Sequence, residues 1–136
     1  LSFGDYPIRD YSRVSHEVAV RTHRGVGTHE ALRRTARDDL GEFTASPLGR
    51  VMTALVVDAR SLLLRYPDAY ERCTVGQTAT VEPNPRGVRL RYTGMHGACS
   101  YTVGQVEGMV LAYQPTCRIL GSHDPTAATL ELDVHL

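Results

Sequence analysis

One pair of side chains has a spacing suited to metal chemistry. His96 and Cys99 stand three residues apart in His-Gly-Ala-Cys, a spacing compatible with zinc ligation. His123 and Cys117 could complete a set of four ligands. No second close pair accompanies them, however, and Cys117 falls in a stretch expected to be a buried strand. We therefore expect Cys99 to be a packed thiol beside a loop histidine, with no metal site.

The sequence lacks a recognisable catalytic motif. A nucleophile elbow, a phosphate-binding loop and the zinc-protease pattern H-E-x-x-H are all missing. Asp38 and Asp39 form an acidic pair. Neighbouring helix positions point about 100° apart, so these two carboxyl groups cannot act together across a substrate. We expect a protein that is not an enzyme.

The composition is that of an ordinary globular domain. The 136 residues are 42% hydrophobic and 22% charged, which suits a single domain, residues 1–136, with its own core. The formal net charge is zero, which argues against nucleic acid as a partner. We therefore expect Arg86, Arg89 and Arg91 to lie on a solvated sheet face or in a dimer contact.

Cysteine usage and hydropathy bear on the compartment. The three cysteines have no short-spaced pair, which indicates reduced thiols in the cytoplasm. No apolar run nears the ~18 residues needed to cross a bilayer, and a signal peptide is not recognisable. We expect a cytoplasmic protein with no membrane partner. The first residue is Leu1 rather than Met, which indicates a fragment or a processed product.

The helices that must position any site fall in the first half, about residues 5–70. Asp5-Tyr-Pro7 predicts the start of a helix that runs to about His23. Thr28 is an expected cap for a second helix, His29 to about Phe43, and Ser46-Pro47 starts a third. The apolar stripes of the three are Ile8, Tyr11, Val14 and Val18; Leu32, Ala36, Leu40 and Phe43; and Val51, Met52, Leu55, Val56 and Ala59.

Two further signals concern the end of this helical part. Residues 58–61 are expected to bend the third helix or to divide it in two. Tyr66-Pro67 is expected to end or kink the helical stretch that runs from residue 62.

The second half, about residues 73–135, predicts a ββαββ unit. Alternating apolar and polar residues indicate strands at 73–82, 88–92, 116–120 and 127–135. A helix from about Ala98 to Tyr113 joins the two hairpins. We expect an α+β fold in which N-terminal helices pack on one face of an antiparallel sheet.

Gly104 and Gly108 stand four apart inside that central helix. Each costs up to ~1 kcal/mol of helix stability relative to alanine, so their presence needs a reason. We predict that they let this face approach a sheet, a second helix or a partner closely.

The order and spacing of several motifs resemble an uncharacterised paralogous family, most abundant in myxobacteria. The matching residues, over nearly the whole chain, are Asp5-Tyr-Pro7, His29-Glu-Ala-Leu-Arg-Arg34, Ser46 with Gly49-Arg50, Tyr66-Pro67 with Tyr70, and Tyr101-Thr-Val-Gly-Gln-Val-Glu-Gly108. More distantly, the ββαββ half resembles the fold of four-vinyl-reductase domains, heme nitric-oxide sensors and Bet3-type trafficking subunits. That resemblance implies a hydrophobic ligand between helices and sheet, and in several relatives a dimer.

The same resemblance raises two cofactor alternatives. Cys99 matches a cysteine of the four-vinyl-reductase pattern, but the turn 121–126 has no cysteine to match its later ligands. Heme would need an axial histidine on a helix, for which His16 and His23 are the candidates. The sensors' alternating tyrosine, serine and arginine are missing, because Tyr11-Ser-Arg13 runs consecutively. We expect no cofactor, with heme and zinc as the alternatives.

We predict a non-enzymatic sensory or regulatory domain that holds a small hydrophobic ligand between its helices and sheet. Six residues are expected to form the cavity wall: Val51, Met52, Leu55, Val56, Val103 and Val106. The alternative is a homodimerising interaction module that binds no small molecule and docks through the face of Gly104 and Gly108 or an exposed hairpin. A formed apolar cavity favours the first, and a filled core with an exposed apolar patch favours the second.

Overall fold

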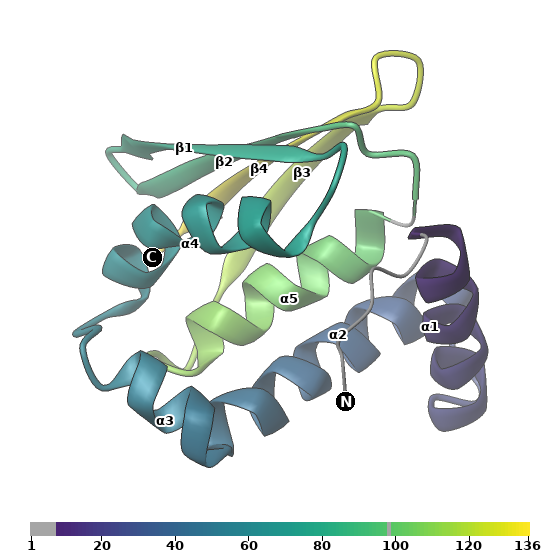
Figure 1. Cartoon of the computed structure of the whole chain (residues 1–136), viewed down its shortest axis with the longest axis horizontal. Coiled ribbons are helices and arrows are strands. Elements are labelled where there is room, and N and C mark those ends of the chain that lie inside the picture. Colours follow the sequence, from purple (N-terminus) through teal and green to yellow (C-terminus); the bar gives the residue numbers. More distant parts are fainter. Residues whose placement is uncertain (1–7, 98) are drawn as a thin grey trace.

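An antiparallel sheet carries helices on one of its faces (Figure 1). The computed structural model describes residues 8–97 and 99–136, apart from the side chains of Ile8, Arg9 and Cys73. Its elements are α1 (Ile8–Thr22), α2 (Thr28–Ala45), α3 (Pro47–Thr53), α4 (Ala59–Cys73), β1 (Thr78–Asn84), β2 (Gly87–Thr93), α5 (Cys99–Leu111), β3 (Arg118–Asp124) and β4 (Thr129–His135). The expected α+β class, with helices first and a ββαββ unit after them, is confirmed. The expected helix start at Asp5-Tyr-Pro7 lies outside the described residues.

The two hairpins join through their second strands, in the order β1-β2-β4-β3. The inner face of this central pair is built from directly opposed side chains: Val88 and Val134, Leu90 and Leu132, and Tyr92 and Leu130. All six are buried. Strict alternation along both strands therefore produces one apolar face, and α4 and α5 cover it.

Helix α5 lies between the sheet and α2. Its Val106 and Val110 are fully buried in the core that it shares with the sheet and α4. Its glycines face the other way. A Cβ on Gly104 would overlap the carbonyl oxygen of Arg33 in α2 and stand 3.0 Å from the Cβ of Ala36. A Cβ on Gly108 would stand 3.1 Å from the Arg37 carbonyl oxygen. The backbones of the two helices therefore lie against each other at these glycines, with no room for larger residues.

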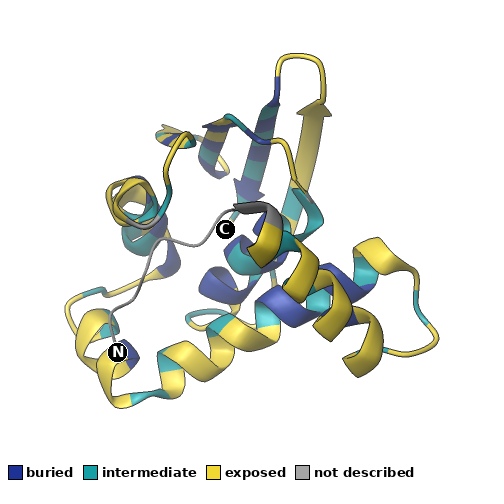
Figure 2. Cartoon of the chain, turned by 45° about the vertical axis from the view of Figure 1, so that its right-hand side comes forward, coloured by how far each residue is buried: buried dark blue, intermediate teal, exposed yellow. Residues whose placement is uncertain are grey.

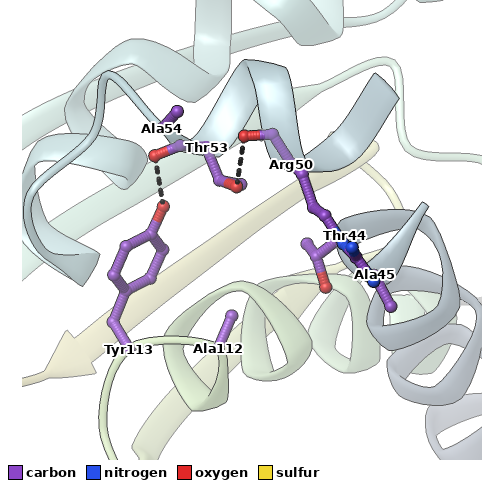
Figure 3. A pocket seen from close by; sticks show the side chains of 7 residues that line it. All are labelled: Thr44, Ala45, Arg50, Thr53, Ala54, Ala112 and Tyr113. Carbon is purple, nitrogen blue, oxygen red and sulfur yellow. Dashed lines mark hydrogen bonds between the residues drawn. The ribbon is translucent and has the colours of Figure 1, made fainter. Parts of the chain in front are cut away.

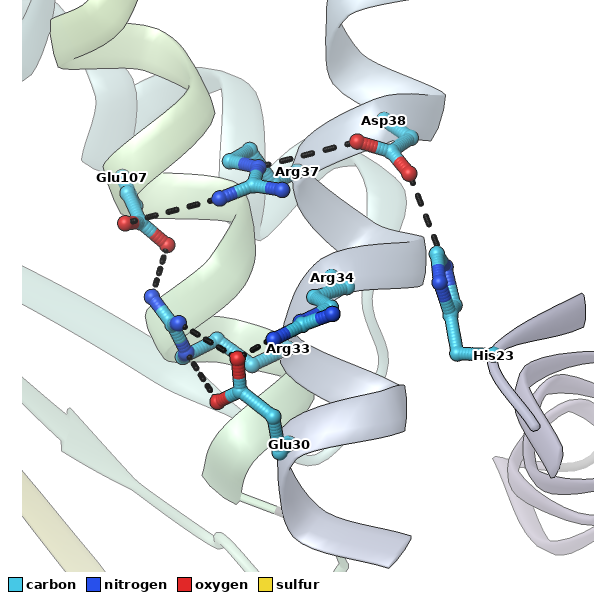
Figure 4. A network of polar contacts seen from close by, with 7 residues as sticks. All are labelled: His23, Glu30, Arg33, Arg34, Arg37, Asp38 and Glu107. Atoms are coloured by element: carbon cyan, nitrogen blue, oxygen red, sulfur yellow. Dashed lines mark hydrogen bonds and ion pairs between the residues drawn. The ribbon is translucent and has the colours of Figure 1, made fainter. Parts of the chain in front are cut away.

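Charged side chains join the same two helices at the edge of this contact (Figure 4). Arg33 donates to the Glu107 carboxylate at 2.5 Å and to Glu30 through two further hydrogen bonds. Arg34 also donates to Glu30, at 2.7 Å. The hydrogen bonds from Arg33 and then from Arg34 lower the pKa of Glu30 to about 2. Beyond them, Asp38 lies 3.5 Å from His23 Nε2 at the end of α1.

The structure departs from the sequence-based expectations at the first and fourth helices. Helix α4 continues through Pro67 to Cys73, so Pro67 does not end it. Pro67 is buried, and its neighbours Tyr66 and Tyr70 pack against Tyr92 of the sheet, so tertiary packing outweighs the lost backbone hydrogen bond. In α1, three residues of the expected apolar stripe, Tyr11, Val14 and Val18, are exposed rather than buried. Ala19 is the buried residue there, since only a small side chain fits this close to α2.

We predict that Gly104→Ala destabilises the protein by ~1–3 kcal/mol, because the new methyl group must displace α2 backbone. The expected sign is opposite to that of an ordinary helical glycine. Gly41 in α2 supplies the matched control, since a Cβ there meets nothing within 4 Å. Gly41→Ala is expected to stabilise by up to ~1 kcal/mol. Urea unfolding of both variants checks the pair, and a Gly104→Ala protein as stable as the wild type would show that α2 and α5 separate freely.

A second prediction concerns acid stability. Because the folded pKa of Glu30, about 2, lies below its ordinary value of 4.5, the carboxylate stabilises the fold fully above about pH 4.5. That contribution is lost as the pH falls from 4.5 to about 2. Glu30→Gln should therefore be less stable at pH 7 and lose less stability across this window. Urea titrations at several pH values measure both slopes, and parallel slopes would contradict the role of Glu30.

Candidate functional site

A surface pocket of about 360 Å³ lies where the end of α2, helix α3 and the end of α5 meet (Figure 3). Its seven lining residues come from these three segments and the residues just after α3 and α5: Thr44, Ala45, Arg50, Thr53, Ala54, Ala112 and Tyr113. The volume is within the range of small-molecule sites. The pocket is open to solvent rather than enclosed, so any occupant would remain partly exposed.

Local sequence explains why the chain turns sharply here. Ser46 caps α3 by accepting a hydrogen bond from the Gly49 backbone N–H at 3.1 Å, and Pro47 occupies the first turn, as Ser46-Pro47 predicted. Gly49 then packs directly on the end of α2, since a Cβ at this position would overlap the Phe43 carbonyl oxygen. Asp58 caps α4 by accepting from the Ser61 N–H at 2.7 Å. The short helix α3 is thus held between two capped turns.

The polar groups of the pocket divide into satisfied and available ones. Both threonine hydroxyls donate within their own segments, Thr44 to the Gly41 carbonyl and Thr53 to the Gly49 carbonyl. The Tyr113 hydroxyl donates to the Thr53 carbonyl at 3.5 Å, and burial raises the pKa of this phenol. Arg50 has no carboxylate within ion-pair distance in the described part of the chain. The pocket therefore offers one uncompensated positive charge.

The residues expected to form a cavity wall lie in two separate places. Val51, Met52 and Leu55 point to solvent, with 69%, 53% and 80% of their surface exposed, and Val56 is half-buried. All four belong to α3 or the segment after it, which borders the pocket. Val103 and Val106 instead pack in the core beside the sheet. The structure does not bring the two groups together around one interior space.

That interior is filled. The largest fully buried side chains are Tyr92, Leu63, Leu90, Leu132, Val88, Val106, Val110 and Val134. Tyr92 lies among the rings of Tyr66 and Tyr70, at centroid distances of 6.5 and 5.3 Å. The seven residues that line the pocket beside α3 were not predicted from the sequence. The signal in the sequence that could have located the pocket is Ser46-Pro47 followed by Gly49, which marks a sharp turn between two helices.

The metal-ligand candidates do not gather into one site in the described part of the chain. His96 is exposed on the loop before α5, and Cys99, the first residue of α5, is half-buried. Cys117 packs against the core, and His123 is exposed on β3. Among residues 8–97 and 99–136, no three histidine, cysteine or acidic side chains lie close enough to share a metal ion.

Comparison with known protein families identifies the family of this chain. The family model described as "Protein of unknown function (DUF2378)" matches residues 1–133. The chain belongs to the DUF2378 family. The family resemblance expected from the sequence is thereby confirmed, and no curated protein matches the DUF2378 chain.

The fold of this DUF2378 chain is shared with H-NOX domains. An NMR structure of an H-NOX variant from Shewanella oneidensis, in its Fe(II)CO state, aligns with a TM-score of 0.77 and 15% identity, covering 100% of this chain and 78% of that one. An H-NOX variant from T. Tengcongensis aligns with a TM-score of 0.72 and 12% identity, over 97% and 75%. A third structure, from work on heme redox potential and porphyrin distortion, aligns with a TM-score of 0.71 and 12% identity. The alignment covers 100% of this chain and 79% of that one. At identities this low, the structural similarity establishes a shared fold and nothing further.

These relatives overturn the expectation that the DUF2378 chain has no cofactor. The folds most like it include heme-binding H-NOX domains, so heme is a candidate cofactor that must be tested. A heme held inside the fold needs an axial ligand there and space for the porphyrin. None of the six histidines is buried, and the space between sheet and helices is filled by the core side chains. The residues present therefore do not fit a histidine-ligated heme between helices and sheet.

The outer sheet face and the helices were also compared with the partners expected from the sequence. On the outer sheet face, Arg89 donates to Asp133 at 2.8 Å and Arg91 donates to Glu131 at 2.8 Å. Arg89 and Arg91 are thus paired with carboxylates on this face of the sheet. In the described part of the DUF2378 chain, no helix combines the length and the apolar character that crossing a membrane requires.

The packing of the thiols yields a prediction. Burial raises the pKa of Cys117 to about 11 and also raises the pKa of Cys99. The thiolate is the reactive form, so in a Cys73→Ser background both thiols should label at least ~tenfold more slowly than free cysteine at pH 8. Alkylation followed by mass spectrometry measures each site. Labelling of Cys99 at the rate of free cysteine, or zinc in elemental analysis, would contradict the packed-thiol assignment.

Proposed function

We propose that the DUF2378 chain is a sensory or regulatory domain that binds a small, mostly apolar ligand at the pocket beside α3. The observation that carries the proposal is a pocket of about 360 Å³ bordered by a short helix whose aliphatic side chains face solvent. Clustered exposed aliphatic side chains mark binding surfaces in soluble proteins. The H-NOX-like fold supports the sensory class, since the relatives are ligand-binding domains of that architecture.

The predicted wall residues divide into two groups under this proposal. Val51, Met52 and Leu55 belong to the exposed aliphatic surface of α3 and the segment after it, beside the pocket, where an apolar ligand can extend onto them. Methionine suits this position because its unbranched thioether adapts to irregular shapes. Val103 and Val106 pack in the core beside the sheet and lie outside this pocket.

Arg50 indicates the chemistry of the ligand's polar end. Its guanidinium is uncompensated at the mouth of an otherwise neutral pocket, and guanidinium groups bind carboxylates with charge-assisted hydrogen bonds. A molecule with an apolar body and one acidic group, such as a fatty acid or a tetrapyrrole carboxylate, therefore matches the site better than a neutral hydrocarbon.

A protein-docking module is the second candidate. The filled core and the exposed side chains of Leu48, Val51, Met52, Leu55 and Val57 favour it. In that case the aliphatic surface around α3 binds a protein partner, and the pocket holds no small molecule.

The test is a thermal-shift panel of fatty acids, quinones and tetrapyrroles, heme included. At a concentration of one hundred times its Kd, a ligand that binds only the folded state stabilises it by about 2.7 kcal/mol. Ala112→Trp should remove the shift by filling the pocket. The control is Val75→Trp, at an exposed site before β1, which should keep the shift. Arg50→Gln should weaken acidic ligands and leave the matching alcohols unchanged.

Three results would contradict the ligand-binding proposal. These are no shift with any compound, a shift that survives Ala112→Trp, or equal loss with Val75→Trp. The first of them, together with a protein partner lost on Val51→Glu, would establish the docking module instead.

A further inference from the structure

Helix α1 leaves its larger apolar side chains about half exposed. Its contact with α2 is made by Ala19, which is fully buried and packs with Ala31 and Leu32. Tyr11, Val14 and Val18 keep 47%, 54% and 46% of their surface exposed. Figure 2 shows this helix as mostly exposed. An amphipathic helix normally buries its aliphatic stripe, so this one lacks its partner.

The exposed residues form a continuous stripe with the geometry of a helix–helix interface. Tyr11, Val14 and Val18 follow one another at three- and four-residue steps, which places them along one side of α1. The stripe is also held in a fixed position. The Tyr11 and Tyr101 hydroxyls lie 2.7 Å apart, and Tyr101 donates in turn to Asp39 of α2. His23 lies 3.5 Å from Asp38 at the other end of α1.

Charges beside the stripe specify the orientation of a partner helix. Asp10 and Arg21 are both exposed, at opposite ends of α1. They stand eleven residues apart, about three helical turns, so they lie on the same side of the stripe. Arg21 also meets Glu17 at 3.9 Å, an exposed pair that contributes little. In an antiparallel pair of identical helices, Asp10 of each copy lies beside Arg21 of the other. A parallel pair would place this flank of the two helices on opposite sides of the contact, so neither charge would meet its counterpart.

We infer that this stripe, Tyr11, Val14 and Val18, docks on the same stripe of a second copy, with the two α1 helices antiparallel. Val14 of each copy packs on Val18 of the other, and two Asp10–Arg21 pairs flank the apolar contact. A second copy fits better than an anionic partner, because α1 carries charges of both signs and the chain has a net charge of zero. The interface is separate from the pocket beside α3 and does not depend on it.

The experiment combines native mass spectrometry with sedimentation velocity over a concentration series. We expect a dimer that Val14→Glu with Val18→Glu converts to a monomer of unchanged circular dichroism. Asp10→Arg alone and Arg21→Asp alone should each weaken association at least ~tenfold, because each places like charges at both flanks. The combined exchange, D10R with R21D, should restore the wild-type affinity.

Val51→Glu on α3 is the matched control, since it places the same charge on another exposed aliphatic site. It should leave the dimer intact. A wild-type monomer at every concentration would overturn the inference, as would a dimer that persists in the α1 valine variant. Loss of the dimer with Val51→Glu, or failure of the exchanged charges to restore it, would also overturn the inference.

Discussion

The contact between α2 and α5 is the constraint on which the rest of the structure depends. Gly104 and Gly108 have no side chain, so the α5 backbone lies directly against the Arg33 and Arg37 carbonyl groups of α2. Because one face of α5 is used in this way, Val106 and Val110 on the other face can fill the core beneath the sheet. The ion pair from Arg33 to Glu107 closes the edge of the contact and opposes sliding of one helix along the other.

This arrangement separates a fixed frame from elements attached at its margin. The sheet, α4, α5 and the middle of α2 share one apolar core. Helix α1 meets α2 through small residues, and α3 packs on the end of α2 after a tight turn at Gly49. Elements with few buried contacts open at low free energy, and ligand-binding segments are drawn from them. Both surfaces with a proposed role, the pocket beside α3 and the stripe of α1, lie on these marginal helices.

The strand periodicity and the turn residues predicted most of the fold. Alternation along β2 and β4 predicted the buried inner face, and Ser46-Pro47 predicted the start of α3. These signals are local, so a single sequence contains them. Of the two effects predicted for Tyr66-Pro67, an end or a kink, the end does not occur. Pro67 is tolerated through packing of Tyr66 and Tyr70 on Tyr92, which lies over twenty residues later in the chain.

The site was harder to foresee than the fold. A helical stripe such as Tyr11, Val14 and Val18 shows that a helix has an apolar side, but it does not say whether the molecule's own core or another partner covers that side. The lining of the pocket comes from three segments that meet only after α2 and α5 have packed. The expectation of no cofactor failed for a related reason, since fold similarity to heme-binding domains is not visible in any short motif.

The central claim is that α2 and α5 form a fixed frame and that α3, attached at its margin, opens separately from it; native-state hydrogen exchange tests this most directly. The Arg50 and Ala54 amides, which bond to the Ser46 and Arg50 carbonyl groups, report on α3. The Val106 and Val110 amides report on the frame. We predict at least ~100-fold faster exchange in α3, through local openings that are insensitive to denaturant. Equal protection in α3 and α5 would contradict the account, because it would show that the two open together.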